Sequence, residues 1–233
     1  MKPRPAMVAA GLAALLIFAG FVALGVWQIH RRTWKLALIE QVDARAHATP
    51  VAVPPPGAPI TADKDAYRRV VARGVFLHEA ETLVRAATAL GSGYWVVTPL
   101  RTPNFVVLVN RGYVSPEQRT AHARPPGEQT VTGYLRVTEP VGGFLRSNDP
   151  AHGAWYSRDV AAIARARGLA SVAPYFIDAD RTGDAAPVGG LTVIAFPNNH
   201  LTYILTWFAL AGLTLVAFGI VVRYDRRRQA SGT

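Results

Sequence analysis

The residues best suited to chemistry stand at the start of an apolar segment near the C-terminus. From Leu201 to Val222 none of the 22 residues carries a charge, and at about 1.5 Å per residue such a helix crosses the roughly 30 Å hydrocarbon layer of a membrane. His200 precedes this run, with Tyr203 and Trp207 at i+3 and i+7 on its own helix face. A neutral imidazole can ligate haem iron, and an apolar face can hold the macrocycle. His200 is therefore a candidate haem-iron ligand, in a helix predicted over residues 200–222.

A simpler interpretation of the same residues needs no cofactor. Asn198, Asn199 and His200 can cap the helix, because short polar side chains accept hydrogen bonds from its first backbone N–H groups. Tyr203 and Trp207 can belong to the aromatic belt that membrane proteins place at the interface. Composition alone leaves both interpretations open.

A second uncharged run covers 25 residues, from Pro5 to Ile29, and predicts another membrane-spanning helix over residues 6–29. A signal peptide is the alternative, but its apolar region is only about 7 to 15 residues long. Trp27 and His30 lie at the outer end of this run; Trp27 is a candidate haem contact, and His30 either a second ligand or an interfacial residue. The absence of an Arg- and Ser-rich mitochondrial presequence indicates the bacterial inner (plasma) membrane.

Basic residues near the spans predict the orientation of this two-pass protein. Arginines at 223, 226, 227 and 228 follow the second helix and favour a basic cytoplasmic tail over residues 223–233. The residues around the first helix weakly favour the opposite orientation, but a long domain can be translocated regardless of its charge. We expect residues 1–5 to be cytoplasmic as well, and the domain between the helices, residues 61–199, to be periplasmic.

The segment between the spans begins with a helical extension and a proline-rich spacer, over residues 30–60. The helix should end near Ala48, since five prolines follow between Pro50 and Pro59. Beyond them, short β-branched runs predict a mainly antiparallel β (α+β) extracytoplasmic domain or small barrel. The expected strands are Tyr67–Leu77, Glu81–Ala86, Tyr94–Leu100, Phe105–Arg111, Thr130–Val137, Pro174–Ala179 and Leu191–Phe196, with one helix near Asp159–Arg167.

Composition excludes several classes of function. The chain has no cysteine, which rules out disulfides, thiolate ligands and thiol catalysis. Its formal charge is +10, of which six basic residues and one acid in the tails give +5. The rest is scattered without a basic helix or an aromatic-studded strand motif, so nucleic acid is not an expected partner.

The β-rich domain shows no convincing catalytic constellation. Its four histidines, at positions 47, 78, 122 and 152, lie far apart without metal-ligand spacing. Asp149 and Asp159 could form an acid/base pair, but Asn148-Asp149-Pro150 is typical of a turn and Asp159 of a helix cap. Arg111, at the end of a buried strand, is expected to be structural. We therefore predict that the chain is not an enzyme.

Over nearly its whole length the chain resembles the Surfeit locus protein 1 family of cytochrome c oxidase assembly factors. The order of the short motifs, the two flanking helices and the last motif carry the resemblance. The motifs are Leu24-Gly25-Val26-Trp27-Gln28 with Arg31 and Lys35, Arg73-Gly74-Val75-Phe76, Gly93-Tyr94 with Thr98-Pro99, Val109-Asn110-Arg111-Gly112-Tyr113-Val114, Asn148-Asp149-Pro150, Trp155, and Asn198-Asn199-His200-Leu201 with Tyr203 and Thr206-Trp207-Phe208. Tyr113 and Ser115 depart from the residues common in the family.

The resemblance implies a membrane protein that assists haem a delivery to, or insertion into, subunit I of a haem-copper oxidase. Its haem-ligand candidate is His200, with Trp207 nearby; His30 is outside the motif. Haem a synthase and other oxidase assembly factors are further expected partners, beside membrane lipid. The alternative is a structural scaffold that stabilises immature subunit I without binding haem.

Overall fold

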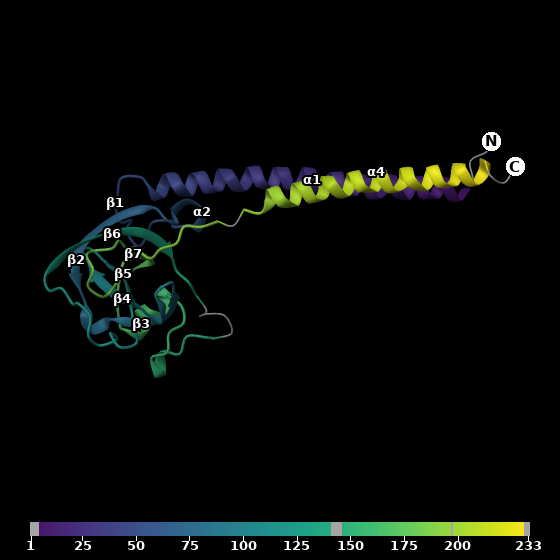
Figure 1. Ribbon diagram of the computed structural model, residues 1–233. Helices are drawn as coiled ribbons and strands as arrows, with labels where there is room; N and C mark the ends of the chain where they lie inside the picture. The colour runs from purple at the N-terminus through teal and green to yellow at the C-terminus, as the bar shows by residue number, and fades with distance from the viewer. Residues whose placement is uncertain (1–4, 141–145, 197, 231–233) are drawn as a thin grey trace. The chain divides into compact units, whose positions relative to one another are not determined.

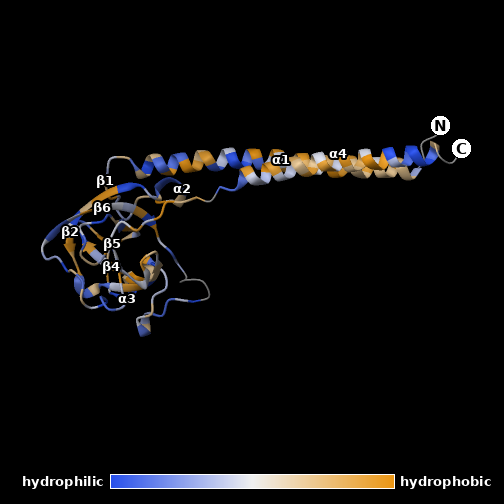
Figure 2. Ribbon diagram, in the orientation of Figure 1, coloured by the Kyte–Doolittle hydropathy of each residue, from blue (hydrophilic) through white to orange (hydrophobic). Residues whose placement is uncertain are grey.

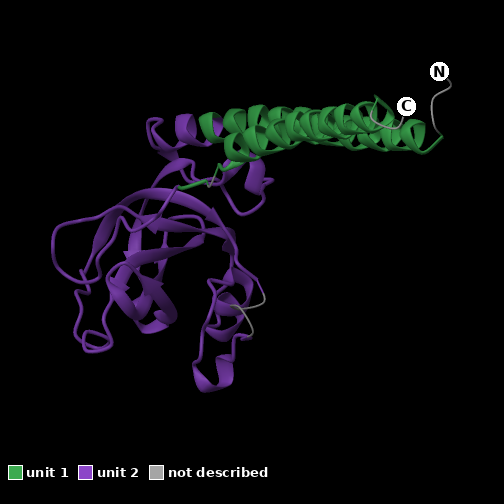
Figure 3. Cartoon of the chain, turned by 45° about the vertical axis from the view of Figure 1, so that its right-hand side comes forward, with its two compact units in different colours: residues 1–40, 195–233 green, residues 41–194 purple. Residues whose placement is uncertain are grey.

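The computed structural model describes residues 5–140, 146–196 and 198–230 (Figure 1). The chain divides into two compact units, residues 1–40 with 195–233 and residues 41–194 (Figure 3). Two helices build the first unit: α1, Pro5–Ala46, whose last residues belong to the second unit, and α4, His200–Ala230. The second unit contains the β-sheet.

The helices α1 and α4 lie side by side and antiparallel (Figure 1). Glycines let them approach closely: a Cβ on Gly25 would lie 2.9 Å from the Phe208 ring, and one on Gly11 would lie 3.3 Å from the Phe218 ring. Small residues of this kind allow helices to pack where no hydrophobic effect drives them together.

Both helices are long and apolar enough to span a membrane, and Figure 2 shows hydrophobic residues along much of both. None of the apolar window of α1, and only 6% of that of α4, is buried within the chain. A core helix of a soluble protein would bury such a surface. The helix α1 ends at Ala46, two residues before the predicted end, and α4 continues beyond Val222 through the arginine-rich segment to Ala230.

A seven-stranded, barrel-like sheet forms most of the second unit. Its order is β1-β2-β6-β7-β5-β4-β3. An additional pairing of β2 with β4 closes β2, β6, β7, β5 and β4 into a ring. Gly74 permits this closure, because a Cβ there would lie only 2.2 Å from the carbonyl oxygen of Arg101. The strands are β1 Val51–Ala52, β2 Arg69–Phe76, β3 Thr82–Thr88, β4 Gly91–Arg101, β5 Val106–Val114, β6 Glu128–Val137 and β7 Val172–Ala179. The short helices are α2 Ala62–Asp65, η1 His78–Ala80, η2 Pro150–His152 and α3 Val160–Ala166.

The predicted antiparallel character is largely confirmed, with β1–β2 and β5–β7 as parallel pairs within the described residues. The predicted strand Leu191–Phe196 is wrong, because the described residues there form no strand. Thr192 instead donates its hydroxyl to Asp178 of β7. Since β7 already pairs with β5 and β6, it has no free edge for another strand.

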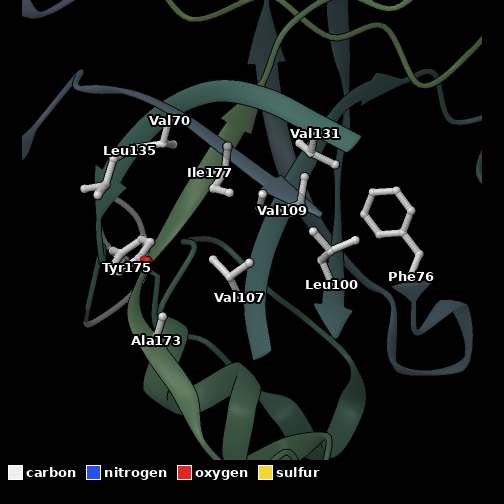
Figure 4. Close-up of a cluster of buried hydrophobic side chains, with 11 residues drawn as sticks. Val70, Phe76, Leu100, Val107, Val109, Val131, Leu135, Ala173, Tyr175 and Ile177 are labelled. Carbon is white, nitrogen blue, oxygen red and sulfur yellow. The ribbon is translucent and has the colours of Figure 1, made fainter. Parts of the chain in front are cut away.

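Side chains alternate between two apolar clusters along β5 and β7, as the period of two in a strand requires. Val107, Val109 and Ile177 point into one cluster (Figure 4). Leu108 and Phe176 point into the other, which packs against Trp155 and α3. The helix α3 is capped as predicted by Asp159, whose carboxylate accepts from the backbone N–H of Ala162 at 3.0 Å.

A buried carboxylate, Asp178, organises the polar side of the domain. Its side chain is 4% exposed and accepts hydrogen bonds from Asn110 at 2.8 Å, Arg136 at 2.8 Å, Arg158 at 2.9 Å and Thr192 at 3.1 Å. A buried charge is tolerated only when it is paired and hydrogen-bonded in this way.

The pKa of Arg158 reflects this pairing. Burial alone would lower the pKa of its guanidinium, but the charges and hydrogen bonds of Asp178 and Glu139 outweigh burial and raise it. Arg158 therefore remains a cation inside the domain.

Replacing Asp178 by alanine should destabilise the β domain by about 3–5 kcal/mol, because Arg136 and Arg158 would keep buried charges without this partner. Urea unfolding followed by the tryptophan fluorescence of the solubilised chain measures the loss. The matched control is Asp184→Ala, since Asp184 pairs with Arg181 but its side chain is 95% exposed, and exposed pairs contribute little. Equal midpoints for the two variants would contradict a central role for Asp178.

Candidate functional site

His200 is the first residue of α4, and its side chain contacts Gln28 of α1. The Nδ1 atom of His200 lies 2.7 Å from Oε1 of Gln28. Gln28 is 8% exposed, so its polar amide depends on such a partner. An amide oxygen can only accept, and Nδ1 therefore carries the hydrogen in this pair.

This hydrogen bond leaves the other ring nitrogen of His200 available. In a neutral imidazole with a hydrogen on Nδ1, Nε2 keeps its lone pair. No hydrogen bond to Nε2 is formed by any group in the described part of the chain. Metal-bound histidines have this arrangement, in which the second nitrogen donates to an oxygen and fixes the ring.

Trp207 lies two helical turns beyond His200, towards α1. Its ring stacks on Phe21, with centroids 5.8 Å apart and an interplanar angle of 27°. Its Nε1 is buried and has no hydrogen-bond partner among the described residues. A buried N–H donor without a partner is uncommon in native structures, and it marks a place where a hydrogen-bond acceptor can still bind.

The other predicted haem contacts lie elsewhere on the helices. Tyr203 is 52% exposed and Trp27 is 56% exposed. A helix turns about 100° per residue, so i+7 returns to within about 20° of His200, whereas i+3 deviates by about 60°. Trp207 thus shares the inward face of His200, and Tyr203 lies at the side.

Trp27 precedes Gln28 in α1 and is more than half exposed, and the described aromatic partner of Trp207 is Phe21. His30 is also exposed. The structure therefore joins His200 to Gln28, a residue that the sequence analysis quoted in a motif without giving it a role. The sequence did contain a signal for this role, because Gln28 has the one side-chain amide in the uncharged run from Pro5 to Ile29.

The capping interpretation is not supported at Asn198. Its Oδ1 is buried without a hydrogen-bond partner among the described residues, whereas a capping oxygen accepts from the first turn of the helix. The backbone carbonyl of Asn199 accepts from the N–H of Tyr203 at 3.4 Å. His200 uses its side chain for Gln28 instead of the helix end.

The polar residues of the β domain form local pairs. The Asp149 carboxylate accepts from the backbone N–H of His152 in the predicted turn and lies 2.7 Å from its Nδ1. The hydrogen bond with His152 lowers the pKa of Asp149. With Asp149 in this turn and Asp159 capping α3, both carboxylates have the structural roles expected of them.

Arg111 is buried and pairs with Glu81 at 3.4 Å. Burial lowers the pKa of its guanidinium, and Glu81 opposes that effect. Glu81 also lies 2.9 Å from Nε2 of His122, which is enclosed by the domain. Within the described ranges, no three His, Asp or Glu side chains are grouped as a metal site would require.

The structure thus defines a class of protein: two helices that could span a membrane, a β-barrel-like domain between them, and an imidazole–amide pair joining the helices. The sequence model of the SURF1 family matches residues 15–212. Surfeit locus protein 1 from Mus musculus is 35% identical over 223 residues, covering 86% of this chain and 71% of the mouse protein.

Two other relatives agree. Surfeit locus protein 1 from Homo sapiens is 36% identical over 225 residues, covering 86% of this chain and 73% of the human protein. The SURF1-like protein of Drosophila melanogaster is 33% identical over 239 residues, covering 91% and 77% of the two chains. The chain therefore belongs to the SURF1 family, a family of assembly factors linked to cytochrome c oxidase assembly.

Substituting Gln28 by leucine should change the tautomer of His200. Leucine has similar size but offers no acceptor for Nδ1–H, so the ring hydrogen is no longer held on that nitrogen. Nitrogen-15 NMR of histidine-labelled, solubilised protein distinguishes the two tautomers. Gln41→Leu, which alters an exposed side chain of the same helix, should leave the His200 signals unchanged; unchanged signals in Gln28→Leu would contradict the assignment.

Proposed function

We propose that this protein assists the delivery of haem a to subunit I of a haem-copper cytochrome c oxidase, and that His200 ligates the haem iron during the transfer. The observation that supports this most directly is the Gln28–His200 hydrogen bond, which leaves the Nε2 lone pair of His200 free beside apolar helix faces. Membership of a family linked to oxidase assembly supports the oxidase as the destination.

The residues present fit haem as a cargo. His200 offers a neutral nitrogen ligand, and Gln28 orients it. Trp207 holds a buried N–H donor without a described partner, and the exposed rings of Trp27 and Tyr203 provide apolar surface at the same end of the helices. Bound haem would supply the iron that His200 ligates. A single protein ligand suits transfer, because a site that bound too tightly would retain its cargo.

The proposal includes a location. Both helices would span the bacterial inner (plasma) membrane, with the β domain in the periplasm and both termini in the cytoplasm. The arginines that end α4 favour this orientation, since basic residues accumulate on the cytoplasmic side. Haem a synthase and other assembly factors are the partners that such a carrier would need.

A scaffold function is the second candidate, supported by the outward apolar faces of α1 and α4. Such faces can pack against the helices of immature subunit I without any cofactor. The two candidates differ in one measurable respect, which is whether the purified chain carries haem.

The substitution His200→Ala should remove most of the haem from protein purified from a host that makes haem a, because it deletes the iron ligand. The visible spectrum and the extracted pigment measure occupancy per chain. His30→Ala, which removes an exposed imidazole of α1, is the matched control and should retain the wild-type spectrum.

Equal occupancy in wild type and His200→Ala would exclude His200 as the ligand. Wild-type protein that co-purifies with subunit I but contains no haem would favour the scaffold.

A further inference from the structure

The arginines of the β domain fall into two groups by their partners. Seven of them lie within 4 Å of a carboxylate: Arg68, Arg69, Arg111, Arg124, Arg136, Arg158 and Arg181. Of the remaining arginines, which pair with no carboxylate in the described part of the domain, Arg85, Arg119 and Arg146 share one kind of contact. Their contacts are tyrosine rings: Arg85 and Arg146 lie over Tyr156, and Arg119 lies over Tyr94.

Two of these arginines, Arg85 and Arg146, line a single hollow at the β3–β4 hairpin, and Arg119 lies over Tyr94, which also lines it. The hollow has a volume of about 350 Å³, and Arg85, Arg146, Tyr94, Tyr156 and Ser92 contribute to its lining. No described acidic residue lines it. Guanidinium groups, phenol hydroxyls and a serine hydroxyl can all donate hydrogen bonds to an anion.

Backbone pairing holds one half of the hollow in place. Arg85 of β3 lies directly opposite Tyr94 of β4 in the antiparallel ladder. The N–H of Arg85 also donates to the carbonyl of Trp155 at 2.9 Å. This bond brings the residue after the buried Trp155, which is Tyr156, next to Arg85.

Asn148 holds the other half. Its side-chain oxygen accepts from the backbone N–H groups of Tyr156 at 2.8 Å and Ser157 at 3.1 Å. Asn148 thereby ties the segment that carries Arg146 to the segment that carries Tyr156. The backbone segments that carry the side chains of the hollow are therefore held together by hydrogen bonds of the fold.

The two guanidinium groups of Arg85 and Arg146 are 5.7 and 5.4 Å from the same Tyr156 ring centroid. Two cations that share one ring repel each other, and the lining provides no carboxylate to compensate. The aromatic ring attracts each cation only weakly at an exposed position. An anion bound between them would remove this repulsion and use the donors that face the hollow.

We propose that this hollow is a binding site for a phosphate group. A carboxylate has two oxygens and one charge, which a single arginine can satisfy in a bidentate pair. Two arginines, together with the hydroxyl donors of the lining, suit a group with more charge and more acceptor oxygens, as phosphate has, and arginine clusters are the usual means of recognising it. Soluble phosphate compounds and the headgroups of anionic phospholipids share this chemistry.

The test uses the full chain in neutral detergent, titrated with inorganic phosphate by calorimetry. The double variant Arg85→Glu with Arg146→Glu should weaken phosphate binding by about tenfold or more, because it removes two charge-assisted contacts and adds repulsion. The matched control is Arg101→Glu with Arg165→Glu, which makes the same change in net charge at two exposed arginines. It should bind phosphate as the wild type does, and higher salt should weaken wild-type binding.

Repeating the titration in neutral-lipid nanodiscs that contain phosphatidic acid identifies the source of the phosphate. Competition by phosphatidic acid indicates a lipid headgroup, and an unchanged phosphate affinity indicates a soluble compound. Equal phosphate affinity in the wild type and the Arg85/Arg146 variant would overturn the proposal, as would an equal loss in the control. The softer variant Arg85→Gln with Arg146→Gln, whose near-ultraviolet circular dichroism should match the wild type, separates loss of binding from loss of fold.

Discussion

Polar side chains that lie between two apolar helices must satisfy each other, and this constraint governs the helical unit. Gln28 is 8% exposed, so its amide cannot rely on water for a hydrogen bond. Its hydrogen bond with His200 at 2.7 Å meets this need. It also selects which nitrogen of His200 carries the hydrogen, so a requirement of helix packing produces the ring orientation that a metal ligand needs.

Glycines make this hydrogen bond possible. At Gly25, less than one turn before Gln28, the Phe208 ring occupies the space that a side chain would take. Close approach at this level brings a short amide within reach of an imidazole on the other helix. The aromatic pair of Phe21 and Trp207 lies on the same side, so the inner face of the helix pair is polar at one end and aromatic next to it.

The buried positive charges of the β domain are compensated within that domain. Its buried arginines are neutralised by Asp178, Glu139 and Glu81, and its ring of strands is closed by the β2–β4 pairing. Arg85 and Arg146 stand outside this neutralised network and are held on Tyr156. These two exposed arginines therefore keep positive charges that no carboxylate of the described domain compensates.

The amino-acid sequence by itself determined the two apolar helices, most of the strands and the helix cap at Asp159, because run length, period and capping are local properties of the chain. It also placed His200 at the start of α4. It could not identify Gln28 as the partner of His200, since the two residues are 172 positions apart and helix packing alone decides which faces meet. The strand expected at Leu191–Phe196 failed for the same kind of reason: its alternation is local, whereas both edges of β7, which Thr192 contacts, are already paired with β5 and β6.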